Sequence, residues 1–169
     1  MKPKYVLNNI LTAVTTEVYD KLSFEISNFA NESEGAEYDA CQFELNGLKI
    51  ISRSSKITPK KVGQFVTFWK RDINGITASY SKCDSFDLYV INAKYGNRIG
   101  QFVFPKSELI NKGIIATDLK DGKRGFRVYP VWDEAQNTQS QKTQKWQLNY
   151  FYEIDERTNL ERVKLLYRC

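Results

Sequence analysis

Residues 38–54 read YDACQFELNGLKIISRS, and this stretch decides the fold class. Two segments rich in apolar residues, 38–45 and 48–54, flank the dipeptide Asn46-Gly47. Both central residues of a type I′ turn have positive φ, and Asn-Gly tolerates this conformation better than other dipeptides. The sequence therefore predicts an antiparallel hairpin whose strands lie on either side of residues 46 and 47.

The segments on both sides of this hairpin predict further strands and helices. A second hairpin is expected over 86–93 and 99–104, with its turn around Gly96-Asn97. Apolar residues recur at spacings of three and four over 7–18, which predicts an amphipathic helix. This order of elements predicts a single α/β (α+β) domain in which a mixed β-sheet is flanked by helices. The remaining expected elements are a turn or helix over 22–29, a helix that begins at Thr58-Pro59 and buries Val62, Phe65, Val66 and Trp69, a short helix over 107–112, a strand over 126–131, a helix from 136 through 151, and a final helix that Thr158 caps, with a strand as the alternative.

The composition excludes several classes of enzyme. The chain has 169 residues, 25 Lys+Arg, 20 Asp+Glu and no histidine, which gives a net charge of +5. Without histidine there is no Ser-His-Asp relay, no Cys-His relay and no imidazole ligand for zinc. The three cysteines, Cys41, Cys83 and Cys169, are widely spaced and form no C-x-x-C pair, so we expect reduced thiols in a cytoplasmic protein. The sequence shows no apolar run long enough to cross a membrane and no signal peptide, so we expect no membrane partner.

Charge is segregated along the chain. Eight acids and one base lie between residues 17 and 44, whereas seven bases and no acid lie between 49 and 71. A third segment, 94–127, has eight bases and three acids. The acidic and basic segments could neutralise each other within the fold, or the bases could present one face to a polyanion.

Four stretches of the sequence carry a family resemblance: KITPKKVGQFVTFWKR (56–71), GQFVFPK (100–106), GKRGFRVYPVWD (122–133) and KTQKWQL (142–148). With these stretches the chain resembles the MepB-like family of small bacterial proteins. The resemblance covers about 37–154 and implies a restriction-endonuclease-like core there. The apolar spacing before it predicts a helical N-terminal segment over 4–31, and residues 155–169 are a C-terminal extension of which the resemblance says nothing. It implies no activity, because fold membership alone does not assign a function. The segment Tyr129-Pro130-Val131-Trp132 departs from the Tyr-Pro-Pro-Trp of the family at one position.

A nuclease of that fold would need carboxylates that hold Mg²⁺ and a lysine beside them. The usual carboxylate and lysine, two residues apart on one strand, are not found in the first hairpin, because no acid lies between Glu44 and Asp72. The remaining candidates for catalysis are Glu37, Asp39 and Asp87 with Lys56. The alternative interpretation is that these acids are solvated or pair with nearby lysines and arginines. No cofactor is expected unless the nuclease hypothesis holds, in which case it would be Mg²⁺.

Anion binding is the leading functional hypothesis. The start of the helix expected at Thr58 would combine free backbone N–H groups with nearby lysines. The hypothesis is that the protein binds a phosphate-bearing partner, with nucleic acid favoured, and that no metal site is involved. Two alternatives stay open: a Mg²⁺-dependent endonuclease with an atypical site, and a module that binds a protein or a small ligand. The expected anion-binding residues are Lys56, Lys60, Lys61, Arg71, Lys123 and Arg124.

Overall fold

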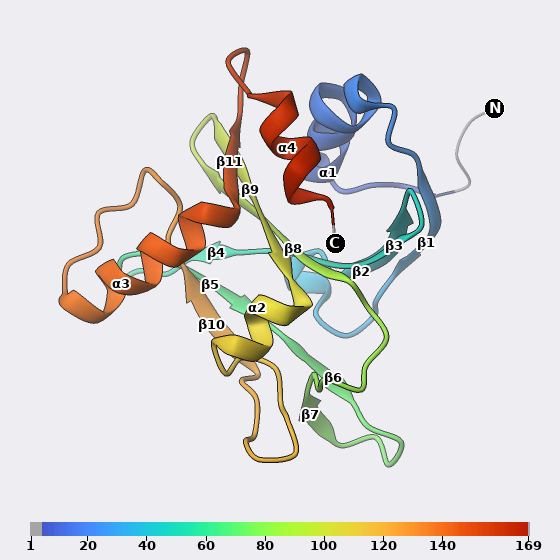
Figure 1. The fold of residues 1–169 in the computed structure, drawn as a ribbon, viewed down its shortest axis with the longest axis vertical. Coiled ribbons are helices and arrows are strands. Elements are labelled where there is room, and N and C mark those ends of the chain that lie inside the picture. The colour runs from blue at the N-terminus through green and yellow to red at the C-terminus, as the bar shows by residue number, and fades with distance from the viewer. Residues whose placement is uncertain (1–4, 169) are drawn as a thin grey trace.

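A six-stranded mixed sheet lies at the centre of the structure (Figure 1). The structure is a computed structural model and describes residues 5–168. Strands β3 (Leu48–Ser54) and β8 (Leu88–Tyr95) are parallel, and the other neighbouring strands are antiparallel. The expected single domain with a mixed sheet flanked by helices is therefore confirmed. In spatial order the strands are β1 (Ile26–Asn31), β2 (Cys41–Leu45), β3 (Leu48–Ser54), β8 (Leu88–Tyr95), β9 (Arg98–Pro105) and β11 (Phe151–Ile154).

Both predicted hairpins are present. Strands β2 and β3 pair with Leu45 opposite Leu48, and the turn residues Asn46 and Gly47 have φ of 51° and 85°. These positive angles are the ones that a type I′ turn requires. Strands β8 and β9 form the second hairpin, which lies in the middle of the sheet and is buried on both faces.

Helices and smaller sheets cover the two faces of the large sheet (Figure 1). On one face, Leu11 from α1 (Asn9–Val14) and Val163 from α4 (Leu160–Leu166) are buried against the sheet. On the other face, Leu109 from α2 (Lys106–Asn111) and Trp146 from α3 (Thr138–Gln147) pack with the core. This second face also contacts a three-stranded sheet. Its strands run in the order β10 (Gly125–Val128), β5 (Gln64–Thr67) and β4 (Lys56–Ile57), and a separate two-stranded ribbon joins β6 (Trp69–Arg71) to β7 (Thr77–Ser79).

The helix predicted from Thr58 is wrong. Residues 58–63 form an irregular loop, and strands β5 and β6 follow it. The buried residues are Gln64, Val66 and Phe68, which alternate as a strand requires, and β5 pairs along its length with β10. The apolar spacing of three and four over residues 62–69 therefore does not produce a helix, because pairing with the distant strand β10 holds residues 64–67 in a strand.

The predicted turn or helix over 22–29, and with it the helical segment expected over 4–31, is also wrong beyond residue 22, because residues 26–31 form strand β1. Ile26 and Phe29 both pack against the core although they are three residues apart. The register of β1 on β2 shifts between Ser27 and Ala30, and Asn28 has a φ of 50°. This bulge inserts an extra residue and so imitates the spacing of a helix.

The other predicted helices are confirmed with shifted ends. Asn8 caps α1, and the chain then continues as a π-helix, η1 (Thr15–Tyr19), and a 3₁₀ turn, η2 (Asp20–Leu22). Asn159 caps α4 in place of Thr158. The helix expected through residue 151 ends earlier, because α3 passes into a 3₁₀ turn, η4 (Leu148–Tyr150), and then into β11. A further 3₁₀ turn, η3 (Ala36–Tyr38), precedes β2.

Two further expectations concern the cysteines and the membrane. Cys41 is buried and Cys83 is exposed, and both are free thiols, whereas Cys169 lies outside the described residues. Within residues 5–168, none of the helices has the length and apolar character that a bilayer crossing requires.

Candidate anion-binding groove

Two glutamines fasten helix α3 to strand β10. The Gln147 side chain is fully buried, its Oε1 accepts a hydrogen bond from the Tyr129 N–H (2.8 Å), and its Nε2 donates to the Arg127 carbonyl (2.9 Å). One turn earlier, Gln144 donates to the carbonyls of Pro130 (3.0 Å) and Asp133 (2.7 Å). Gln144 and Gln147 therefore help to fix the position of α3 against β10 and the residues that follow it, because both amides pair with backbone groups that would otherwise be left unsatisfied.

A groove runs between α3 and β10. One hollow of about 350 Å³ lies between the two elements, and a second of about 390 Å³ extends from it toward the 58–63 loop. The two hollows adjoin each other, because they share the four lining residues Arg127, Tyr129, Asn137 and Ser140.

Five cationic side chains and no carboxylate line this groove, which we call the α3–β10 groove. Arg127 lies at its centre and donates hydrogen bonds to the Thr58 hydroxyl (2.7 Å) and the Gly63 carbonyl (3.3 Å), both of which are neutral. No acid therefore balances the Arg127 charge among the described residues. The other four cations of the groove are Lys60, Lys61, Lys112 and Lys123.

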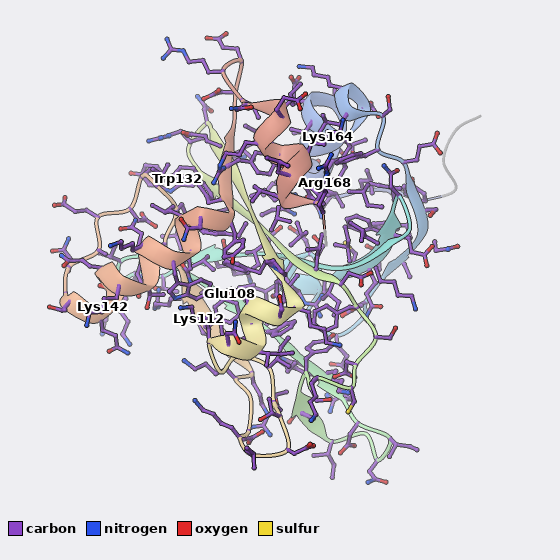
Figure 2. All side chains as sticks on the ribbon, viewed as in Figure 1. Glu108, Lys112, Trp132, Lys142, Lys164 and Arg168 are labelled. Atoms are coloured by element: carbon purple, nitrogen blue, oxygen red, sulfur yellow. The ribbon has the colours of Figure 1, made fainter. Side chains whose placement is uncertain are left out.

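Besides Arg127, Lys112 is a groove cation that the expected anion-binding residues did not include. It lies just after α2, where its Nζ is 3.7 Å from the Glu108 carboxylate and 5.2 Å from the centre of the Trp146 ring. Figure 2 shows Lys112 and Glu108 together on this helix. Lys112 joins the groove only because the fold brings it close to residues that are distant in the chain. Nothing in the sequence around Lys112 therefore distinguishes it from other lysines.

The loop that supplies Lys60 and Lys61 depends on a glycine. Gly63 has a φ of +85°, and a Cβ at this position would lie 2.6 Å from the Tyr129 ring. A side chain therefore does not fit, both because of the left-handed backbone and because of the ring. The close approach holds the loop against Tyr129, which places Lys60 and Lys61 at the edge of the groove.

The structure separates the expected anion-binding residues into two groups, and Arg124 belongs to neither. Lys60, Lys61 and Lys123 line the groove, but no helix begins at Thr58, so the expected site at a helix start is wrong. Arg124 is exposed and its nearest described partner is the Thr77 carbonyl (3.5 Å), which places it beside the β6–β7 ribbon.

Lys56 and Arg71 belong to the second group, because they pair with the acidic segment. A guanidinium hydrogen bond to Glu34 raises the pKa of Arg71. Arg53, which is only 2 % exposed, makes the deepest of these contacts, with a carboxylate 21 residues earlier in the chain. The acidic and basic segments therefore neutralise each other in part within the fold. The three ion pairs are Glu32–Arg53 (2.6 Å), Glu34–Arg71 (2.5 Å) and Glu37–Lys56 (3.4 Å).

The candidate catalytic residues do not assemble into one site. Glu37 and Lys56 contact each other, and Asp39 is exposed at the end of η3. Asp87 accepts a hydrogen bond from the backbone N–H of Lys49, at the start of β3, whereas Lys56 follows the end of that strand. A strand rises by about 3.3 Å per residue, so the two positions are about 20 Å apart. Among the described residues, no group of three or more Asp, Glu or Cys side chains is arranged to hold a metal ion.

Comparison with known proteins adds the following findings. The model of the MepB-like family matches residues 32–153. A solved crystal structure of MepB is 35% identical, with a TM-score of 0.76, and the match covers 82% of this chain and 95% of that one. A second structure, the bacterial homing endonuclease I-Ssp6803I, is 15% identical with a TM-score of 0.48, and the match covers 95% of this chain and 94% of that one. This likeness is too low to carry an argument. No curated protein matches the chain.

Proposed function

Because the chain belongs to the MepB-like family, which by itself names no activity, we propose a function from the site: the protein binds a nucleic acid strand in the α3–β10 groove. The observation that carries this proposal is the lining of the groove, in which five cations and no carboxylate line two adjoining hollows. Arg53 and Arg71, in contrast, are paired with Glu32 and Glu34 and so are not available to a polyanion.

The size of the groove fits a short stretch of a phosphate backbone. Helix α3 has ten residues, and at 1.5 Å per residue it spans about 15 Å. Phosphates along one strand of a duplex are about 3.4 Å apart along the axis, so this length accommodates about four of them. The groove therefore offers several cations to a few successive phosphates, and phosphate contacts supply most of the non-specific affinity.

The lining also supports contact with bases. Tyr129 and Trp146 present aromatic surface within the groove beside the cations. Aromatic side chains interspersed with lysines and arginines are typical of proteins that bind single strands, because each nucleobase has a face on which an aromatic ring can stack. We therefore infer a preference for single strands over duplex, with little dependence on sequence.

The experiment that tests the proposal measures affinity over a salt series. Fluorescence anisotropy with labelled single-stranded DNA, duplex DNA and single-stranded RNA would be recorded for the wild type and two triple variants. The test variant is Lys60→Gln, Lys61→Gln and Lys123→Gln, which removes three groove cations. The matched control is Lys21→Gln, Lys94→Gln and Lys164→Gln, which removes the same charge from exposed lysines outside the groove.

The expected result is a difference in the salt dependence of the two variants. Each lost phosphate contact lowers the slope of log K against log salt by about 0.7 on a single strand, so the test variant should lose about 2 units of slope. The control should keep the wild-type slope and lose little affinity. No binding at low salt, or an equal loss in both variants, would refute the proposal.

A further inference from the structure

A second pocket lies on the opposite face of the large sheet from the α3–β10 groove. It has a volume of about 400 Å³ and lies between the turn of the β2–β3 hairpin and the end of α4. Its apolar lining comes from Phe24, Leu45 and Leu48. The volume falls within the range of about 300–1,000 Å³ that is usual for small-molecule sites.

Rigid aromatic rings form one wall of this pocket. Phe24 and Tyr167 contact each other edge to face, with ring centres 5.7 Å apart, and Tyr19 packs against Tyr167 at 5.6 Å. The Tyr167 hydroxyl is turned away from the pocket, because it hydrogen-bonds to the Tyr19 hydroxyl (2.6 Å) and to Gln101. Tyr167 therefore offers the pocket only the apolar surface of its ring.

Two cations border the pocket and are left without acids. Lys164 and Arg168 lie one helical turn apart, at and just beyond the end of α4 (Figure 2). The pocket lining contains no carboxylate, and neither side chain forms an ion pair with any part of the chain between residues 5 and 168. An apolar floor with two adjacent unpaired cations is complementary to a molecule with an apolar body and one anionic group.

The pocket is assembled in part from segments that the family model does not match. Phe24 precedes the matched residues 32–153, and Lys164, Tyr167 and Arg168 follow them. Leu45 and Leu48, in contrast, belong to the matched core. The pocket thus lies where the two ends of the chain close over the core, and its ligand is set by residues separate from those of the groove.

We propose that this pocket binds a small amphipathic carboxylate. Its alkyl chain lies against Phe24, Leu45 and Leu48, and its carboxylate accepts hydrogen bonds from Lys164 and Arg168. Arginine pairs with a carboxylate through two parallel N–H groups, and the adjacent lysine adds a second charge. This site is independent of the proposed nucleic acid groove, because the two share no lining residue.

Binding would be tested with octanoate, octan-1-ol and acetate as probes. Two-dimensional amide NMR titrations, below the concentration at which octanoate forms micelles, report both the affinity and the residues that respond. Octanoate should bind about tenfold or more tightly than acetate, because it adds apolar surface, and more tightly than octan-1-ol, because it adds the charge. The amide shifts should be confined to the neighbourhood of Phe24, Leu45, Leu48 and Tyr167.

Two variants separate the charged and apolar parts of the site. Lys164→Gln with Arg168→Gln should weaken octanoate binding about fivefold or more and leave octan-1-ol unchanged, since two ion pairs are lost. Leu48→Gln should weaken both probes. The matched control, Lys142→Gln with Arg157→Gln, removes the same charge from exposed positions and should change neither affinity.

Three outcomes would overturn the proposal. One is the absence of saturable shifts with wild-type protein at millimolar octanoate. Another is a set of shifts centred away from the pocket. The third is equal affinity for octanoate and octan-1-ol. All three outcomes are measured on the wild-type protein. The proposal can therefore be refuted even if a variant fails to fold.

Discussion

The attachment of α3 to β10 through Gln147 leads to a quantitative prediction. The substitution Gln147→Met keeps the length of the side chain and the helix propensity but removes both hydrogen bonds of the amide. Two hydrogen bonds contribute about 1–3 kcal/mol in total, and the abandoned backbone groups add to the cost because the site is buried. We expect the free energy of unfolding to fall by about 2–3 kcal/mol.

The assay is urea denaturation of the variant against a matched control on the same helix. Gln139→Met makes the same chemical change at an exposed position of α3 that forms no side-chain hydrogen bond in the described chain. For a domain of this size, each kcal/mol corresponds to about 2–4 °C in Tm, so Gln147→Met should lower the thermal midpoint by about 5–10 °C. If the two variants differ by less than about 0.5 kcal/mol, the reasoning that the amide fastens α3 to β10 is wrong.

Three further predictions follow from buried or strained groups. Gly63→Ala should lower the free energy of unfolding by about 2 kcal/mol or more in urea denaturation, whereas Gly75→Ala, which has a φ of +75° but open space around it, should cost only about 1 kcal/mol; equal losses would contradict the close contact with Tyr129. Burial raises the pKa of the Cys41 thiol to about 12, so peptide mapping after alkylation at neutral pH should find exposed Cys83 labelled and Cys41 unlabelled, and early labelling of Cys41 would argue against its burial. Burial raises the pKa of Tyr19 and Tyr89 well above 10.0, so the contribution of these tyrosines to stability should be constant below about pH 10 and fall as the pH rises further, because only the unfolded chain then releases these protons. Denaturation midpoints that stay level between pH 9 and 11, or a smaller fall in the wild type than in a Tyr89→Phe variant, would contradict this assignment.

The hairpins could be predicted because their signals are local. Asn46-Gly47 defines its own turn geometry, and the flanking residues pair with neighbours only a few positions away. Strands β1 and β5 could not be predicted in this way. A bulge at Asn28 gives β1 the spacing of a helix, and β5 is specified by its pairing with β10, which begins about 60 residues later.

The candidate site was predicted in part. Lys60, Lys61 and Lys123 lie in the groove, as the basic segments suggested, but Lys56 and Arg71 do not act as free cations, because Glu37 and Glu34 pair with them. The partners in these pairs are separated by 19 and 37 residues. Charge counts along a chain identify how many cations are available, whereas their pairing depends on which distant carboxylates the fold brings within reach.

The sequence by itself determined the class of the fold, the two hairpins, the family and the presence of a basic segment without acids. These properties depend on short-range backbone preferences and on composition, which need no knowledge of distant contacts. Only the tertiary structure decided which bases are neutralised and which line the groove, and where the two chain ends form a pocket. The physical reason is that charge pairing and cavity formation depend on distances in space, and those distances are set by the pairing of strands far apart in the chain.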